Sequence, residues 1–242
     1  MNASKIKKAV KNIPGIEPVW NFLSAQVLKA QNPEKVFTNI YRKNAWGDQE
    51  SVSGTGSNLE QTAILRDKLG KLVEGLGVKT LLDIPCGDFH WMHEVDLGDV
   101  NYLGADIVKP LVETNTKKYA SKSVKFCHMD LIKDELPKVD LIFCRDCLVH
   151  LSFDDILKAL NNVVKSGSTY LLTTTFTECK RNENIVTGRW RMLNLNLEPF
   201  KLPPPLSIMN EESKEKSGEY KDKSLALWRV SDIQKALRVR KM

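Results

Sequence analysis

The segment that most constrains the fold of this chain is KTLLDIPCGDFHW, residues 79–91. A short apolar run, residues 81–84, stops abruptly at a turn that contains Gly87. This pattern is typical of a buried parallel strand that runs into a tight turn. We expect the turn to open a helix and to present its backbone N–H groups to a ligand, since glycine lets a ligand approach the main chain closely.

A second acidic residue, Asp106, lies 19 positions after Gly87 and closes the apolar segment 100–105. In nucleotide-binding α/β folds, a carboxylate at the end of the second strand binds the ribose hydroxyls. The glycine turn and this carboxylate together favour a site for a nucleoside-containing ligand.

Short apolar runs and amphipathic segments alternate along the middle of the chain. A capping box at Ser57 and Glu60 predicts a helix that ends at Gly77, and Ser152 with Asp155 predicts another. The apolar runs between and after them predict strands, at residues 81–84, 100–105, 124–129, 141–145, 170–176 and 224–230. Such alternation predicts an α/β fold with a doubly wound, mainly parallel sheet.

Several of these segments resemble the motifs of class I S-adenosylmethionine (SAM)-dependent methyltransferases. LLDIPCGDF is similar to the first motif, with Asp83 at its acidic position and Gly87 at its central glycine; YLGADI resembles the second motif and CHMDL the third. The resemblance covers roughly residues 80–175. It implies a seven-stranded, Rossmann-like sheet, S-adenosyl-L-methionine as cofactor and S-adenosyl-L-homocysteine as product. Pro85 and Phe89 depart from the pattern, because the family usually has glycines there.

The resemblance also assigns roles around the cofactor. It implies that Asp106 binds the ribose, that Asp130 meets the adenine amino group, and that Met129 and Leu131 flank the adenine ring. The other residues expected to bind the cofactor lie in the turns that would surround it: Trp46, Asp83, Pro85, Gly87, Ile107 and Arg145.

Methylation of a hydroxyl requires a base that removes the hydroxyl proton. His150, one of four histidines, follows the fourth expected strand in RDCLVHLS, on the loop that faces the transferred methyl group in the family. We expect His150 to be the general base, because its pKa lies near neutrality, with Asp146 in support. The alternative is that His150 caps the helix that begins at Ser152.

The segments outside the core suggest how the acceptor is covered. We expect residues 1–57 to form an N-terminal helical cap and a cofactor-covering loop; the alternative is a surface loop pinned by aromatic rings. Residues 58–242 would form the SAM-binding core, with an acceptor-side insertion of no regular period at 178–223. Within that insertion the residues expected to bind the acceptor are Trp190, Arg191 and Asn194.

Flat rings and amides stack on sugars and form hydrogen bonds with them, and the overall pattern resembles methyltransferases that modify sugars of surface polysaccharides. We therefore predict O-methylation of a small molecule or glycan, most simply a sugar in polysaccharide or glycan biosynthesis. A nucleic-acid (RNA) methyltransferase is the alternative, suggested by the net charge of +6. A NAD-dependent oxidoreductase is a less favoured alternative, because this chain lacks the G-x-G-x-x-G turn typical of that class. A non-catalytic binding module is a further alternative, but the two acidic residues expected to bind the cofactor would then have no role.

Composition limits the remaining possibilities. With 242 residues and 42% apolar residues, the chain is long enough for one α/β domain with appendages. Five cysteines, no signal peptide and no apolar run of membrane length predict a cytoplasmic protein without a membrane span. Cys144 and Cys147 form a C-x-x-C pair without a second pair or clustered histidines, so no metal is expected. We expect no nucleic-acid partner, and the sequence leaves the oligomeric state open.

Overall fold

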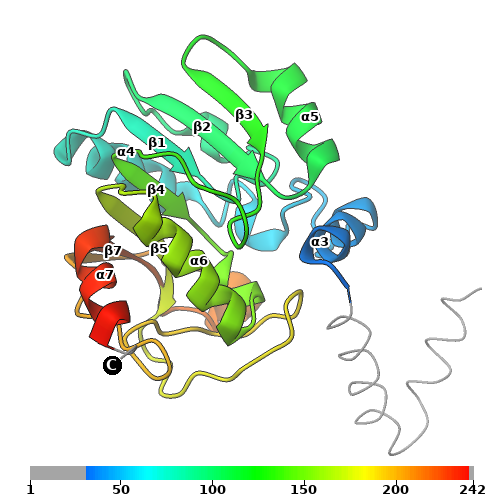
Figure 1. The fold of residues 1–242 in the computed structure, drawn as a ribbon. Helices are drawn as coiled ribbons and strands as arrows, with labels where there is room; N and C mark the ends of the chain where they lie inside the picture. The colour runs from blue at the N-terminus through cyan, green and yellow to red at the C-terminus, as the bar shows by residue number, and fades with distance from the viewer. Residues whose placement is uncertain (1–30, 240–242) are drawn as a thin grey trace, which may run out of the picture.

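Seven strands form one sheet in the computed structural model, which describes residues 31–239 (Figure 1). The order across the sheet is β3-β2-β1-β4-β5-β7-β6. The strands are β1 (Thr80–Asp83), β2 (Asn101–Asp106), β3 (Val124–His128), β4 (Leu141–Cys144), β5 (Tyr170–Phe176), β6 (Ser207–Asn210) and β7 (Lys223–Arg229). Strands β1 to β5 pair in parallel, and β7 is antiparallel to β5 and β6. The predicted doubly wound, mainly parallel seven-stranded sheet is confirmed.

Helices cover both faces of the sheet. Successive strand residues point to opposite faces, so Leu81 packs in one apolar cluster with α4 (Ala63–Gly75), and Leu82 packs in another with α6 (Phe153–Lys165) and α7 (Val230–Val239). In Figure 1, α6 and α7 lie in front of the sheet and α4 lies behind it. Helix α5 (Lys109–Tyr119) packs against β2 and β3.

The strand order places a ligand site at one edge. The chain runs from β1 outward to β2 and β3, and then returns to the other side of β1 to form β4. The crevice outside the carboxyl ends of β1 and β4 is therefore the topological switch point, where open α/β sheets bind ligands. Helix α3 (Pro33–Arg42) precedes the core and contributes Phe37 and Tyr41 to the cavity at this edge.

The first core helix begins later than its sequence predicts. Ser57 and Glu60 do not form a capping box; Ser57 belongs to the 3₁₀ turn η1 (Thr55–Ser57), and α4 begins at Ala63. The side chain of Asn58 instead accepts a hydrogen bond from the backbone N–H of Gln61 (2.9 Å). Ser57 instead lines the cavity. The second predicted cap is confirmed, since Ser152 Oγ accepts from the Asp155 amide at 3.2 Å and α6 begins at Phe153.

The insertion at 178–223 contains regular structure that its sequence does not reveal. It supplies β6 at the edge of the sheet and the 3₁₀ turn η4 (Glu215–Gly218). A four-residue edge strand is too short for a period-two pattern to stand out. At the other end of the chain, the part of the expected N-terminal cap at residues 1–30 lies outside the described residues. Within residues 31–239, no helix has both the length and the apolar character that a membrane crossing requires.

Candidate active site

The glycine turn after β1 is held in place by the neighbouring strands. The Ile84 amide donates to Phe143 O in β4 (2.9 Å), and the Cys86 amide donates to Ala105 O in β2 (2.8 Å). Gly87 has a φ of +55°, and a Cβ on it would lie 2.4 Å from Ser53 Oγ of the loop above. Both the backbone conformation and the close approach therefore require glycine at this position.

Phe89 adopts a left-handed conformation in the same turn, with a φ of +58°. Its ring is buried against Tyr102, Tyr119 and Phe126, at centroid distances of 5.0, 5.2 and 5.1 Å. A left-handed non-glycine residue costs about 1–2 kcal/mol, and burying a phenylalanine contributes about 1.5–3 kcal/mol. The packing of the ring thus offsets the backbone strain, and this explains how phenylalanine stands where the family usually has glycine.

Asp106 joins the ends of β1 and β2. Its Oδ2 accepts from the Gly87 amide (3.2 Å) and its Oδ1 from the Val108 amide (2.8 Å). Burial raises the pKa of Asp106 to about 6, although both amides favour its charged form. Each carboxylate oxygen has a second lone pair, so this carboxylate keeps the capacity to accept ligand hydroxyls.

Asp83 is buried at the end of β1. Tyr102 Oη donates a hydrogen bond to its Oδ2 at 2.5 Å. Burial raises the pKa of Asp83 to about 8, while the hydrogen bond from Tyr102 opposes that rise. At neutral pH this carboxyl therefore holds a proton in a large fraction of molecules.

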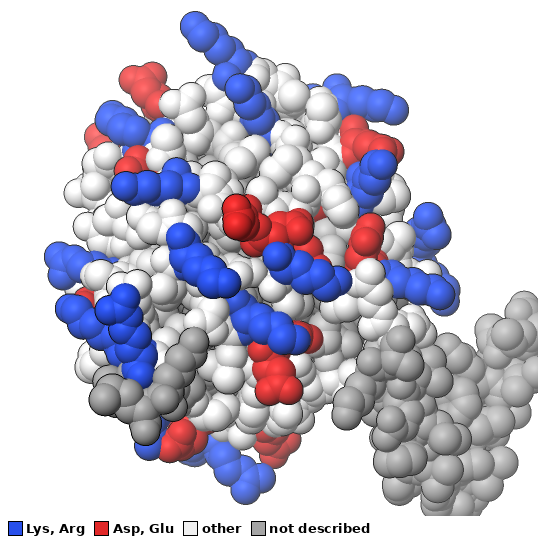
Figure 2. Space-filling view, in the orientation of Figure 1, with Lys and Arg blue, Asp and Glu red and all other residues white. Residues whose placement is uncertain are grey.

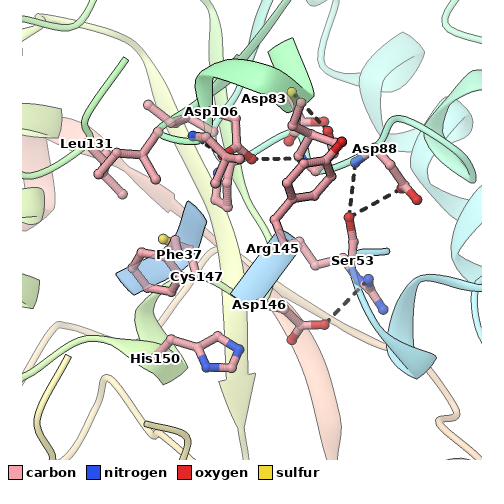
Figure 3. Close-up of a pocket in the computed structure, with 18 of the residues that line it drawn as sticks. Phe37, Ser53, Asp83, Asp88, Asp106, Leu131, Arg145, Asp146, Cys147 and His150 are labelled. Carbon is pink, nitrogen blue, oxygen red and sulfur yellow. Dashed lines mark hydrogen bonds and ion pairs between the residues drawn. The ribbon is translucent and has the colours of Figure 1, made fainter. Parts of the chain in front are cut away.

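Every residue expected to bind the cofactor lines one cavity of about 140 Å³ at the switch point. These residues come from the loop before α4 and from the turns after β1, β2, β3 and β4: Trp46, Asp83, Pro85, Gly87, Asp106, Ile107, Met129, Asp130, Leu131 and Arg145. Figure 3 shows Asp83 and Asp106 at one end of the cavity and His150 at the other. The structure thus brings the three sequence motifs together around one space.

Arg145 lines that cavity, but its charge is already matched. Its Nη2 bonds to Glu211 Oε2 at 2.6 Å and to Gly56 O at 2.8 Å, and its Nε lies 3.2 Å from both Glu211 oxygens. Burial alone would lower the pKa of Arg145, but Glu211 and Asp146 outweigh it and raise that pKa further. Glu211 therefore already neutralises the positive charge of Arg145.

His150 lies in the 3₁₀ turn η3 (Leu148–His150), where its Nδ1 is 3.0 Å from the carbonyl oxygen of Arg189. A carbonyl can only accept, so Nδ1 carries the proton, and the neutral ring leaves Nε2 as an acceptor. Burial lowers the pKa of His150 below its ordinary value, which keeps the ring neutral at pH 7. Because Ser152 caps α6, the alternative that His150 caps this helix is wrong.

Asp146 follows β4 but does not orient His150, whose Nδ1 faces Arg189 instead. Asp146 Oδ2 accepts from Lys223 Nζ at 2.6 Å and lies 3.4 Å from Arg145 Nη1. Burial opposes ionisation of Asp146, but Lys223 and Arg145 outweigh it and lower its pKa to about 2. An acid of this strength is a poor proton acceptor at neutral pH, so the supporting role expected for Asp146 is electrostatic.

The three residues expected to bind the acceptor separate in the structure. Trp190 lines a second cavity beside the first, with 40% of its surface exposed. Arg191 is buried, and its two terminal nitrogens donate to Leu148 O and Leu151 O, each at 2.8 Å. Asn194 is buried as well, and its amide donates to Cys179 O at 3.3 Å. Arg191 thus satisfies carbonyls of the turn around His150, and Asn194 satisfies a carbonyl of the loop after β5. Neither residue lines either of the two cavities.

Several residues of the site escaped prediction. Asp88 holds the covering loop, since its Oδ2 accepts from Ser51 Oγ (2.9 Å) and the Val52 amide (3.0 Å). Glu211 and Lys223 are buried charges that pair across long stretches of chain. The only sequence signal for Lys223 was its position directly before an apolar strand, which does not distinguish a buried lysine from an exposed one.

Comparison with known proteins agrees with this arrangement. Residues 82–172 match the family described as a methyltransferase domain. Uncharacterized methyltransferases of Mycobacterium bovis and Mycobacterium tuberculosis are 25% identical over 149 residues, which cover 55% of this chain and 74% of theirs. Human N-acetylserotonin methyltransferase, solved in complex with SAM, aligns with a TM-score of 0.51 and 17% identity over 82% of this chain. This chain spans 60% of the length of the human enzyme.

The matches identify the chain as a SAM-dependent methyltransferase with S-adenosyl-L-methionine as its cofactor, and the sheet has the fold of the class I enzymes. The residues present fit that cofactor. A glycine turn, a carboxylate after β2 and an acidic residue after β3 all face one cavity at the switch point. Carboxylates accept hydrogen bonds from hydroxyl and amino groups, which matches the donors of a nucleoside.

Proposed function

We propose that this chain transfers the methyl group of SAM to a hydroxyl of a small molecule or glycan, and that a sugar is the preferred acceptor. The observation that carries the proposal is His150, a neutral imidazole with a fixed tautomer that lines both cavities. Bound SAM supplies an electrophilic methyl group on its sulfonium. The protein has to hold the acceptor near that methyl group, exclude water and remove one proton.

His150 supplies the proton acceptor in this proposal. Its Nε2 is unprotonated because the Arg189 carbonyl fixes the proton on Nδ1. A hydroxyl bound between the two cavities would pass its proton to Nε2 as its oxygen bonds to the methyl group, and the methyl–sulfur bond would break to leave S-adenosyl-L-homocysteine. The resulting imidazolium is stabilised by the negative charge of Asp146, which favours protonation of His150. General base catalysis of this kind contributes about 10² to 10⁴ in rate.

The cofactor-binding roles in the proposal follow the placement of the acidic residues. Asp106 would accept hydrogen bonds from the ribose hydroxyls, and Asp130 would accept from the adenine amino group. Met129 and Leu131 flank the same part of the cavity and would pack on the adenine ring. Positioning donor and acceptor in this way can supply up to roughly 7–11 kcal/mol toward the barrier.

The charge distribution supports a small acceptor over a nucleic acid. Lys and Arg side chains are spread over the face shown in Figure 2, with Asp and Glu among them, and they form no continuous basic stripe there. A nucleic-acid substrate would neutralise several basic side chains at once, so its affinity would fall steeply with salt. We expect gel-shift titrations with DNA and RNA to show no salt-sensitive binding in the micromolar range.

The direct test uses SAM with a carbon-13-labelled methyl group and a panel of sugars, small hydroxyl compounds, small amines and RNA. We expect the label to appear on oxygen, which NMR distinguishes from nitrogen and carbon by its chemical shift. A label on nitrogen, or label transfer only to RNA, would reject the proposal. Release of S-adenosyl-L-homocysteine measured in the same reactions gives an independent count of turnovers.

A further inference from the structure

A second cavity, of about 330 Å³, lies beside the cofactor cavity. That volume falls in the roughly 300–1,000 Å³ range of small-molecule sites. The two cavities share part of their lining, since the same side chains face both: Trp46, Ser53, Ser57, Asp146 and His150. A molecule in the second cavity would therefore meet His150 at the border with the first.

One wall of the second cavity consists of aromatic rings from distant parts of the chain. Trp190 lies 4.9 Å from Tyr220 and 6.0 Å from Phe176, measured between ring centroids. Tyr220 and Phe176 are buried, whereas Trp190 keeps 40% of its surface exposed. The two buried rings thus pack against Trp190 and hold it at the cavity wall, and its flat indole suits a ring-shaped ligand.

The floor of the cavity carries a charged group made by Lys223, Asp146 and Glu215. Lys223 Nζ lies 2.6 Å from Asp146 Oδ2 and 3.3 Å from Glu215 Oε2. Thr55 Oγ1 also donates to Glu215, at 3.0 Å. Lys223 and Thr55 thus donate their hydrogen bonds to carboxylates of the protein. The carboxylate oxygens keep free lone pairs, which can accept hydrogen bonds from a ligand.

The charges in this group do not balance. Two carboxylates and one ammonium line the cavity, and Arg145 pairs with Glu211 behind them, so the group has an excess of one negative charge. A buried anion placed beside it would meet a like charge, which costs several kcal/mol. Lone pairs, a flat ring and negative charge together select a ligand that donates hydrogen bonds and carries no anionic group.

We propose that the second cavity is the acceptor site and that it holds a hydroxyl-rich ring without an anionic group, a single sugar unit, while it rejects acidic sugars. Trp190 stacks on the sugar ring, and Glu215 accepts hydrogen bonds from its hydroxyls. The inference rests on the proposed hydroxyl methylation, because it uses the position of His150 to place the reacting oxygen. Beyond the proposed function, the inference specifies where the acceptor binds, which residue stacks on it and which ligand charge the site rejects.

The experiment is ligand-detected NMR on the full chain saturated with S-adenosyl-L-homocysteine. Three probes share one ring and differ in charge: methyl glucoside is neutral, glucuronate is anionic and glucosamine is cationic. We expect methyl glucoside to bind, and glucuronate to bind at least about tenfold more weakly. Comparable affinity for glucuronate and methyl glucoside would overturn the charge preference, and binding of glucosamine alone would indicate a cation site instead of a sugar site.

Variants place the binding in this cavity. Trp190→Ala should weaken binding of methyl glucoside by about three- to tenfold, and Trp190→Phe should restore most of it, because a ring remains to stack. Glu215→Gln should reduce the discrimination against glucuronate. Equal affinity in wild type and Trp190→Ala would overturn the assignment of the site. Calorimetry with S-adenosyl-L-homocysteine, expected to be unchanged, shows that each variant is folded.

The outcome separates this inference from the proposed function. If methyl glucoside binds through Trp190 and the labelled methyl group never appears on an oxygen, the proposed methylation of a hydroxyl is wrong, and the second cavity is still a sugar-binding site. If hydroxyls are methylated while Trp190→Ala leaves both sugar binding and KM unchanged, the chemistry stands and the site assignment fails.

Discussion

On the cofactor side, the Asp106 carboxylate binds the amide of Val108, two residues away, and that of Gly87 in the turn beside it. On the proposed acceptor side, Lys223 of the second cavity binds Asp146 across 77 residues. Lys223 also lies 3.7 Å from Glu211, which binds Arg145 of the first cavity across 66 residues. Backbone donors next to a strand end shape the first half of the site, whereas buried ion pairs between distant segments shape the second. A short motif can specify the first kind of site, but the second kind exists only in the folded chain.

The largest effect that should separate the two halves comes from His150→Ala. We expect kcat to fall by about 10² to 10⁴ while affinity for S-adenosyl-L-homocysteine stays near wild type, because a base acts on turnover and not on cofactor binding. Only the neutral form of His150 is a base, and burial lowers its pKa below the ordinary value of about 6.5. Wild-type kcat should therefore also fall at acidic pH, with its midpoint below that ordinary value.

Ser152→Ala is the matched control for His150→Ala, since Ser152 caps the adjacent helix. It should lose about 0.5–2 kcal/mol of unfolding free energy and keep its turnover. If instead His150→Ala retains wild-type kcat, the base lies elsewhere. A pH profile without an acidic limb would lead to the same conclusion.

The second expected effect concerns the ion pair that holds the acceptor side together. Glu211→Gln leaves Arg145 buried without its main counter-charge, and breaking such a pair costs about 3–5 kcal/mol of unfolding free energy. Glu212→Gln changes the next residue, which forms an exposed pair with Lys68 at 3.1 Å, and should cost no more than about 1 kcal/mol. Urea unfolding of both variants measures the difference, and equal stabilities would show that the buried network does not support the fold.

The third expected effect falls on the cofactor side. Asp106→Asn should weaken binding of S-adenosyl-L-homocysteine by about 1–3 kcal/mol, the loss expected when hydrogen bonds to a charged group are removed. Glu113→Gln, an exposed position on α5, removes the same charge without touching the cavity and should bind normally. Calorimetry measures the affinity of the two variants for S-adenosyl-L-homocysteine. Unchanged affinity in Asp106→Asn would show that Asp106 does not bind the ribose.

The last expected effect is a pH dependence of stability caused by Asp83, which is small per pH unit and accumulates over a wide pH range. Its folded pKa of about 8 is above the ordinary value, so the folded state binds more protons than the unfolded state between about pH 4 and 8. Stability should therefore decline as the pH rises through that window, by at most about 1.4 kcal/mol per pH unit. Asp83→Asn should flatten this slope in unfolding measurements at several pH values; a slope identical to wild type would assign the effect to another group.

The sequence predicted the sheet around the first cavity for the same reason that the two halves differ. It was wrong about the helix expected after the glycine turn, since only the 3₁₀ turn η2 (Met92–Glu94) follows before β2. The sheet, the glycine turn and Asp106 follow from strand ends and spacing, which are local in the sequence. The tautomer of His150 could not be predicted, because it depends on a carbonyl at Arg189, 39 residues away. Arg191 and Asn194 looked like acceptor ligands because polar type alone does not reveal whether a side chain faces a cavity or satisfies loop carbonyls.

The left-handed Phe89 has a consequence for how the glycine turn acquires its shape. A turn made of glycines can adopt left-handed conformations in a short peptide, but Phe89 reaches its conformation at a cost that is offset by rings from β2, α5 and β3. The turn is thus stable only after these elements have docked. Formation of the cofactor pocket should coincide with global folding of this half of the sheet, and a peptide that contains only residues 79–91 should not retain the shape of the turn.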